Sequence, residues 1–76
     1  MTMNERIVLA AVKKVCEERR EAKRYPATAL FVEVQRYTPG ITREGLIDAL
    51  QKLTQEGKLR EYATVNSKAY EPLAKD

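Results

Sequence analysis

The side chains most often used in catalysis are nearly absent from this chain of 76 residues. It contains no histidine, and therefore no imidazole base, and Cys16 is its only thiol. One thiol without histidine can form neither an internal disulfide nor a zinc site of cysteine and histidine ligands. The three glycines, Gly40, Gly45 and Gly57, fit neither a phosphate-binding loop nor a dinucleotide-binding fingerprint. We therefore expect a protein that is not an enzyme and that binds no metal or cofactor.

Basic side chains are the other group with a chemical meaning. The net charge is +3 and the pI is about 9.2. The surplus lies in residues 1–25, which hold seven basic and four acidic residues, whereas the other 51 residues hold seven of each. A mildly basic protein favours anionic partners such as nucleic acid, so the charge gives a modest indication of that class of partner.

The composition is that of one folded domain covering residues 1–76. Hydrophobic residues make up 43% of the chain and charged residues 33%, which is too apolar for a disordered chain and leaves room for one core. The longest apolar run, Ile7 to Val12, is far too short to span a bilayer. Lys13 and Lys14 follow it without a small-residue cleavage site. We expect no membrane association and a cytoplasmic protein.

The first part of the chain predicts a long helix. Asn4 to Arg24 contains no glycine or proline, has apolar residues at helical spacing, and offers Asn4 as its N-cap. Pro26 ends this helix, because the residue before a proline is pushed out of the α region. The stretch at residues 25–27 could then supply a short third strand.

A second helix is expected after Thr28, which is a suitable N-cap. Its apolar stripe would consist of Leu30, Phe31 and Val34. The helix stops at residues 38–41, where Pro39 and Gly40 suit the two central positions of a type II turn.

The third helix has the clearest limits, Thr42 to about Glu56. Thr42 can cap it, and Gly57 is suited to the left-handed conformation that ends a helix. At about 100° per residue, one side carries the apolar residues and the other the polar ones. The predicted core face holds Leu46, Ile47, Leu50 and Leu53, and the predicted outer face holds Glu44, Asp48, Gln51, Lys52 and Gln55.

Two strand-like segments, Leu59 to Val65 and Lys68 to Leu73, follow with Asn66-Ser67 between them. They predict a β-hairpin. A two-residue turn at Asn66-Ser67 would pair Ala63 with Tyr70, whereas a three-residue turn would set Glu61 against Glu71. Like charges opposite one another are unfavourable, so we expect the first register. It would place Leu59, Ala63, Val65 and Tyr70 on one face.

Three helices, a short turn between the second and third, and then a hairpin form a mainly α fold with a small β part. This α+β order resembles the winged helix-turn-helix superfamily. The stretch from Thr42 to Leu59 resembles the third helix and first wing strand of such domains, and Lys68-Ala69-Tyr70-Glu71-Pro72-Leu73 resembles the returning wing strand. The resemblance covers nearly the whole chain and implies a single winged-helix domain with a two-stranded wing.

The resemblance also implies binding of double-stranded DNA, with the third helix in the major groove and the wing on phosphates. The protein would then be a transcriptional or mobile-element regulator. Arg43 could contact guanine, and Gln51 or Gln55 could contact adenine. The expected DNA-contacting residues are Thr42, Arg43, Gln51, Lys52, Gln55, Lys58, Arg60 and Lys68.

Two alternatives stay open at this point. The third helix carries more acidic than basic residues, which favours a winged-helix module that binds another protein and not DNA. The apolar side of the first helix is also wider than a three-helix core needs. We therefore expect an uncovered edge at Leu9 and Cys16 that could mediate a homodimer.

Overall fold

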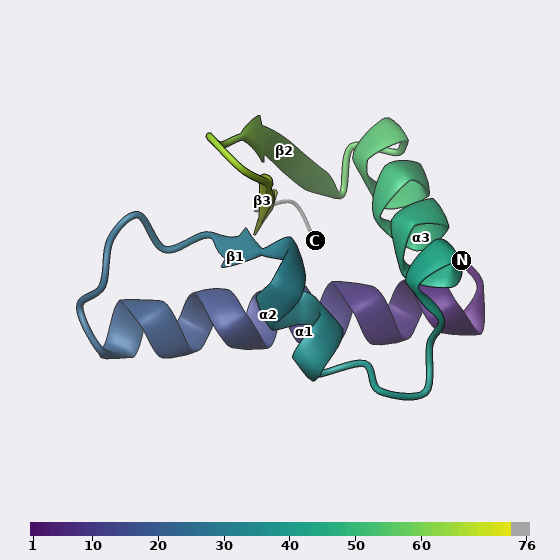
Figure 1. Ribbon diagram of the computed structural model, residues 1–76, viewed down its shortest axis with the longest axis horizontal. Helices are drawn as coiled ribbons and strands as arrows, with labels where there is room; N and C mark the ends of the chain where they lie inside the picture. The colour runs from purple at the N-terminus through teal and green to yellow at the C-terminus, as the bar shows by residue number, and fades with distance from the viewer. Residues whose placement is uncertain (74–76) are drawn as a thin grey trace.

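The computed structural model describes residues 1–73, which form three helices and a three-stranded antiparallel sheet. The elements are, in chain order, α1 (Met3–Glu21), β1 (Ala29–Leu30), α2 (Phe31–Arg36), α3 (Arg43–Gln55), β2 (Leu59–Ala63) and β3 (Lys68–Pro72). The strands lie in the order β1-β3-β2, and α2, α3 and β3 all pack against α1 (Figure 1). The expected α+β fold with three helices and a C-terminal hairpin is confirmed.

Helix α1 begins earlier than its sequence predicts, because Thr2 and not Asn4 is the N-cap. The Thr2 hydroxyl oxygen accepts from the backbone N–H of Glu5 at 3.2 Å. The Glu5 carboxylate in turn accepts from the backbone N–H of Thr2 at 3.4 Å. This reciprocal pair is a capping box, and it satisfies two N–H groups that the helix itself leaves unpaired. Asn4 therefore lies inside the first turn.

Helix α1 ends at Glu21, three residues before the predicted end at Arg24. The conformation of Lys23 determines this end. Lys23 has a positive φ of 58°, in the left-handed region. The Arg24 N–H donates to the Arg19 carbonyl at 2.8 Å, which completes a Schellman-type cap. The chain thus leaves the helix before the proline that was expected to end it.

The third strand lies at Ala29–Leu30 and not at residues 25–27. Ala29 is fully buried and pairs with Tyr70 of β3. A strand at residues 25–27 would have included Pro26, which has no N–H to donate to a neighbouring strand. The strand therefore forms after the proline.

Helix α2 begins at Phe31, so the prediction that Thr28 caps it is wrong. The N-cap is Leu30, whose backbone N–H donates to the Glu33 carboxylate at 3.0 Å. The other carboxylate oxygen of Glu33 accepts from the Arg19 guanidinium at 2.8 Å. Burial alone would raise the pKa of Glu33, but the hydrogen bonds from Arg19 and Leu30 lower it. Glu33 thus ties α2 to both β1 and α1.

A turn precedes α3, and it is not of the predicted type. The Ile41 N–H donates to the Thr38 carbonyl at 3.1 Å, as in a β-turn. A type II turn needs a positive φ at Gly40, and among the described residues only Gly57 is a glycine with a positive φ, of 78°. The predicted limits of α3 are confirmed, since Thr42 caps it by accepting from the Gly45 N–H at 3.0 Å and Gly57 follows its end.

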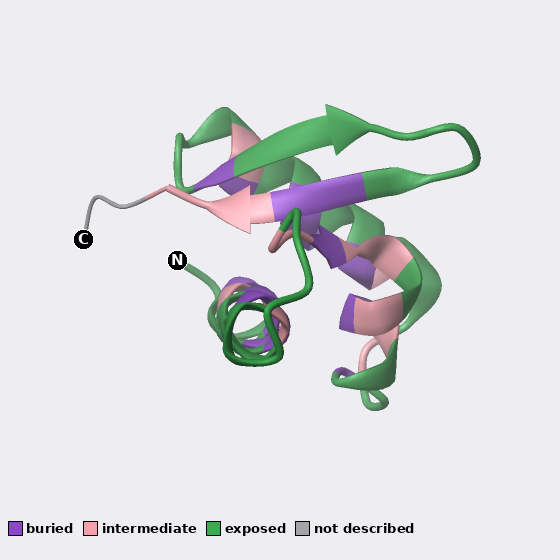
Figure 2. Ribbon diagram, turned by 90° about the vertical axis from the view of Figure 1, so that its left-hand side faces the viewer, coloured by how far each residue is buried: buried purple, intermediate pink, exposed green. Residues whose placement is uncertain are grey.

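The hairpin register differs from the predicted one by two residues. Ala63 pairs with Lys68, and Glu61 pairs with Tyr70, so residues 64–67 form a four-residue loop. This register sets Arg60 opposite Glu71, and opposite charges on facing strands attract. The outer part of the hairpin extends beyond the core and is exposed (Figure 2).

Because the hairpin extends beyond the core, its loop and the residues next to the loop are exposed. Leu59 and Tyr70 are buried as predicted, whereas Ala63 is exposed and Val65 is 97% exposed. Those two face predictions are wrong, because the part of the hairpin next to the loop extends beyond the core.

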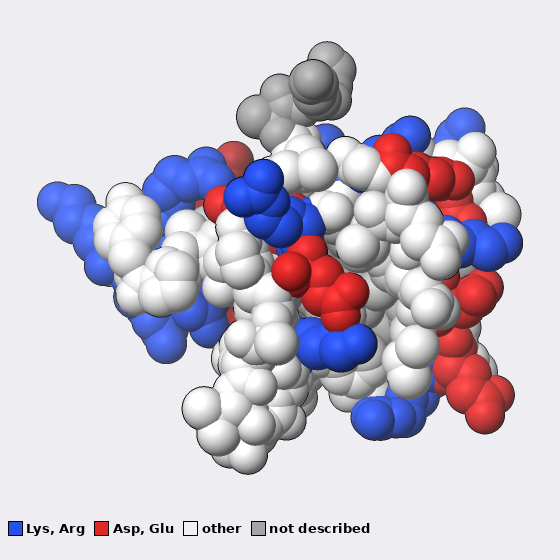
Figure 3. Space-filling view, turned by 90° about the horizontal axis from the view of Figure 1, so that it is seen from above, with Lys and Arg blue, Asp and Glu red and all other residues white. Residues whose placement is uncertain are grey.

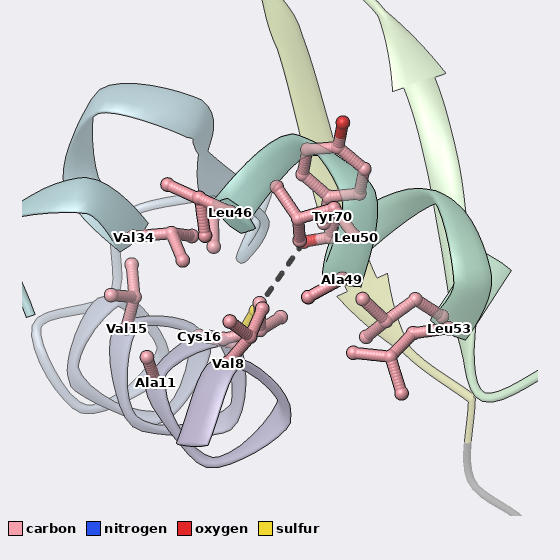
Figure 4. Packing of buried hydrophobic residues seen from close by; sticks show 13 residues of the cluster. Val8, Ala11, Val15, Cys16, Val34, Leu46, Ala49, Leu50, Leu53 and Tyr70 are labelled. Carbon is pink, nitrogen blue, oxygen red and sulfur yellow. Dashed lines mark hydrogen bonds between the residues drawn. The ribbon is translucent and has the colours of Figure 1, made fainter. Parts of the chain in front are cut away.

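The core lies where α1, α3 and the sheet meet (Figure 4). Leu46, Leu50 and Leu53 are buried as predicted, but Ile47 is 43% exposed because it sits about 100° around the helix from Leu46. The buried cluster consists of Val8, Ala11, Val12, Val15, Cys16, Ala29, Val34, Leu46, Ala49, Leu50, Leu53, Leu59 and Tyr70.

Leu50→Ala should destabilise the fold by about 2–5 kcal/mol, because it removes buried methyl groups and leaves a cavity. The next residue, Gln51, is exposed, so Gln51→Ala should cost less than about 0.5 kcal/mol. Urea unfolding of both variants measures the difference. Equal costs would mean that the buried face of α3 is misassigned.

Glu33 should make the stability depend on pH. Its pKa is lower in the folded than in the unfolded chain, so its contribution is present above the ordinary carboxyl pKa of 4.5 and is lost as the pH falls through the folded value. Glu33→Gln should therefore lower the free energy of unfolding at neutral pH and flatten its fall in acid. Glu17→Gln, at an exposed position of α1, is the matched control. An unchanged acid profile for Glu33→Gln would contradict the proposed tie.

Candidate nucleic-acid interface

A groove lies between the N-terminal end of α3 and the loop of the hairpin. Its volume is about 280 Å³, and residues from α2, α3, the loop and β3 line it. Two of the eight predicted DNA-contacting residues, Arg43 and Lys68, come together here although they are 25 positions apart in the sequence. The lining residues are Phe31, Arg43, Ile47, Asn66, Ser67, Lys68 and Tyr70.

Arg43 is the first residue of α3, and its position is fixed by the cap before it and the ring beside it. Thr42 accepts from the Gly45 N–H and so begins the helix at Arg43. The Arg43 guanidinium carbon lies 5.2 Å from the ring centre of Phe31, within the range of a cation–π contact. Phe31 thus holds the arginine at the groove while its charge stays available to a ligand.

Lys68 begins β3 on the other side of the groove. Its ammonium group is 2.8 Å from the Glu61 carboxylate on β2, and this hydrogen bond and the opposite charge raise the pKa of Lys68. The lysine side chain is still 62% exposed. An anion that binds Lys68 must compete with Glu61, so this contact is weaker than that of a free lysine.

The four-residue loop is held closed by its own hydrogen bonds. The Thr64 N–H donates to the Ser67 carbonyl at 2.9 Å. The Ser67 N–H donates to the Thr64 hydroxyl oxygen at 3.0 Å. Asn66 and Ser67 are exposed and line the groove. The two loop residues therefore border the same groove as the two cations.

The other predicted residues of α3 do not share this groove. Thr42 is exposed, but its hydroxyl oxygen is used in the cap. Gln51 and Gln55 lie on the outer face of α3. Lys52 is nine positions after Arg43 and therefore half a turn away, where it lines a hollow against the start of α1. The predicted single DNA-facing set on α3 is thus divided between two sides of the helix.

The predicted wing cations Lys58 and Arg60 are both exposed, Arg60 on the outer strand β2 and Lys58 directly before it. Lys58 lies 3.9 Å from the Glu56 carboxylate, and Arg60 faces Glu71 across the strands. Each cation has an acidic neighbour. Lys58 and Arg60 therefore add less positive potential than two cations without acidic neighbours would.

Charge is distributed unevenly over the molecule. Acidic side chains lie along the right edge of Figure 3, over α3, and basic side chains gather on the left, over the C-terminal part of α1. The exposed Glu44 and Asp48 flank the outer face of α3. Of the α3 surface, the side towards the groove, where Arg43 lies, is the one best suited to approach phosphates.

Sequence reasoning missed five residues of the groove, including Tyr70, which was assigned to the buried face of the hairpin. Phe31 and Ile47 were assigned to apolar faces and Asn66-Ser67 to a turn without a role. Ile47 could have been found, since the 100° step from Leu46 already places it at the margin of the buried face. The loop residues could not, because their place depends on a register that local sequence does not determine.

The predicted dimer edge is largely covered within the chain. Cys16 is 1% exposed, and its thiol donates to the Tyr70 carbonyl at 3.6 Å. Burial raises the pKa of this thiol. Leu9 is partly buried against the core. The assignment of Cys16 to an exposed edge is wrong, because β3 packs on this side of α1, and the exposed apolar side chains of α1 are instead Met3 and Ile7.

Comparisons with protein-family models, with curated proteins and with solved structures found no match to this chain. Within residues 1–73, no helix is long and apolar enough to cross a membrane. The same residues contain no group of three or more histidine, cysteine, aspartate or glutamate side chains that could hold a metal ion.

Proposed function

We propose that this chain is a winged helix-turn-helix domain that binds double-stranded DNA, as a transcriptional or mobile-element regulator does. The order of its elements supports this, since a short turn separates α2 from α3 and a hairpin follows. The observation that carries the proposal is the meeting of Arg43 and Lys68 in one groove with Asn66 and Ser67. Two cations beside amide and hydroxyl donors are suited to phosphate oxygens.

The contact would be made by the N-terminal end of α3 and the hairpin loop. The first N–H groups of a helix and the helix dipole both favour negative charge. Both would therefore stabilise a phosphate bound near Arg43. With the helix end in the major groove, Arg43 can reach the acceptors of guanine. Lys68, Asn66 and Ser67 would then contact the neighbouring backbone.

The acidic residues of α3 limit how the helix can lie. Glu44 and Asp48 repel phosphates, so α3 would enter the groove by its end and not along its length. A carboxylate can still accept a hydrogen bond from the amino group of cytosine. Glu44 would therefore contribute to sequence preference and reduce general affinity.

A second candidate function is binding of another protein through the same groove. Its floor is partly apolar, and the nearby Val32 and Val65 are 48% and 97% exposed. Exposed apolar side chains around a groove are typical of protein-binding surfaces. The two functions predict different responses to salt.

DNA affinity should fall steeply with salt, because phosphate contacts release counterions. Lys68→Ala should weaken binding and reduce the slope of log K against log salt by about 1. Fluorescence anisotropy with a short labelled duplex of mixed sequence, at several salt concentrations, measures both quantities.

Lys14→Ala is the matched control, since Lys14 is an exposed lysine of α1 that also lies near a glutamate, Glu18 at 3.9 Å. It should leave the slope unchanged. No association of the unaltered protein at low salt would contradict the DNA proposal and favour the protein-binding one. Equal effects of both variants would mean that the hairpin has no special role.

A further inference from the structure

We propose that the crevice between the C-terminal half of α1 and α2 binds a small phosphate-like oxyanion, either free phosphate or the phosphate group of a small molecule. The crevice has a volume of about 350 Å³, at the lower end of the range for small-molecule sites. It is separate from the groove at Arg43, with which it shares no lining residue. It is lined by Val15, Glu18, Arg19, Ala22, Arg24, Glu33, Arg36 and Tyr37.

Three arginines and two glutamates line the crevice, and the glutamates are already engaged. Glu33 accepts from the Arg19 guanidinium and from a backbone N–H of β1. Glu18 accepts from the hydroxyl of Tyr37. Neither Arg24 nor Arg36 has an ion pair among the described residues. Two guanidinium groups therefore remain to meet an anion.

Arg19 also has N–H donors that make no hydrogen bond to the described residues. It can offer five N–H groups, and within the described residues its side chain makes one hydrogen bond, from Nη2 to Glu33 at 2.8 Å. Its Nε is buried and has no hydrogen-bond partner in residues 1–73. A buried donor without an acceptor is unfavourable, and a small turn of the guanidinium towards an anion in the crevice would relieve this.

The end of α1 brings Arg24 to this place. The positive φ of Lys23 and the bond from the Arg24 N–H to the Arg19 carbonyl fold the chain back at the helix end. Arg36, in the last turn of α2, approaches from the other side. The crevice is thus formed by the C-terminal ends of two helices, whose partial negative charge opposes an anion, so binding depends on the arginines. A guanidinium group can donate to two oxygens at once, which suits phosphate better than a spherical ion.

Arginine side-chain NMR tests this binding without DNA, so the result is independent of the proposed function. The Nε–H signals of the ¹⁵N-labelled protein are followed while inorganic phosphate replaces chloride at constant ionic strength. Signals of Arg19, Arg24 and Arg36 should shift and saturate together, whereas those of Arg6 and Arg60 should drift only slightly. Phenyl phosphate in a second titration tests whether the crevice prefers a phosphate that carries an organic group, and acetate tests for a simple carboxylate.

Arg36→Gln should weaken phosphate binding by about tenfold or more, as loss of a charge-assisted hydrogen bond does. Arg6→Gln, at an exposed position near the start of α1, should leave it unchanged. If Arg36→Gln does not fold, Arg24→Gln serves in its place. Linear, unsaturated drift of all arginine signals, or unchanged saturation in the crevice variants, would overturn the proposal.

Discussion

Strand β3 is the element on which the other contacts depend, because it pairs on both edges and packs on α1. Tyr70 faces Ala29 of β1 and Glu61 of β2, and its carbonyl accepts from the thiol of Cys16. The strand thus connects the first helix, the short strand before α2 and the outer strand of the hairpin. Lys68 is the first residue of this strand and Ser67 directly precedes it, so their position relative to α3 follows from this packing.

The groove at Arg43 illustrates a balance of opposing charges. Arg43 and Lys68 would attract an anion, but Glu61 holds the lysine and Glu44 lies close by on α3. Few phosphate contacts can form at such a site, so the affinity contributed by charge is modest. Shape and hydrogen bonds from the loop would then contribute a larger share than in a strongly basic DNA-binding domain.

The sequence predicts features that depend on neighbouring residues better than those that depend on distant ones. The limits of α3 follow from Thr42 and Gly57, whose cap geometries are local, and the structure confirms them. The start of α1 was missed because Thr2 and Asn4 are both good caps, and only the position of Glu5 favours the first. The pairing of Arg60 with Glu71 favours the observed register, but it needs a four-residue loop, whereas Asn66-Ser67 indicates a two-residue turn.

The candidate site was predictable only in part, for the same reason. Arg43 and Lys68 were expected to contact DNA, yet nothing local to either residue places them in one groove. Their placement in one groove depends on the hairpin register and on the packing of β3. The basic surplus of residues 1–25 likewise gave no sign that two of its arginines would line a crevice with Arg36 of α2.

Backbone amide NMR during titration with DNA tests most directly the central claim, that the groove at Arg43 is the proposed DNA contact. During titration with a short duplex, the account predicts that the amides of Arg43 and Ile47 and those of residues 64–68 shift together, with one midpoint. Shifts confined to the basic C-terminal end of α1, around Arg20 and Lys23, would contradict it. They would mean that DNA binds the general positive charge of the first helix and that the groove has another role.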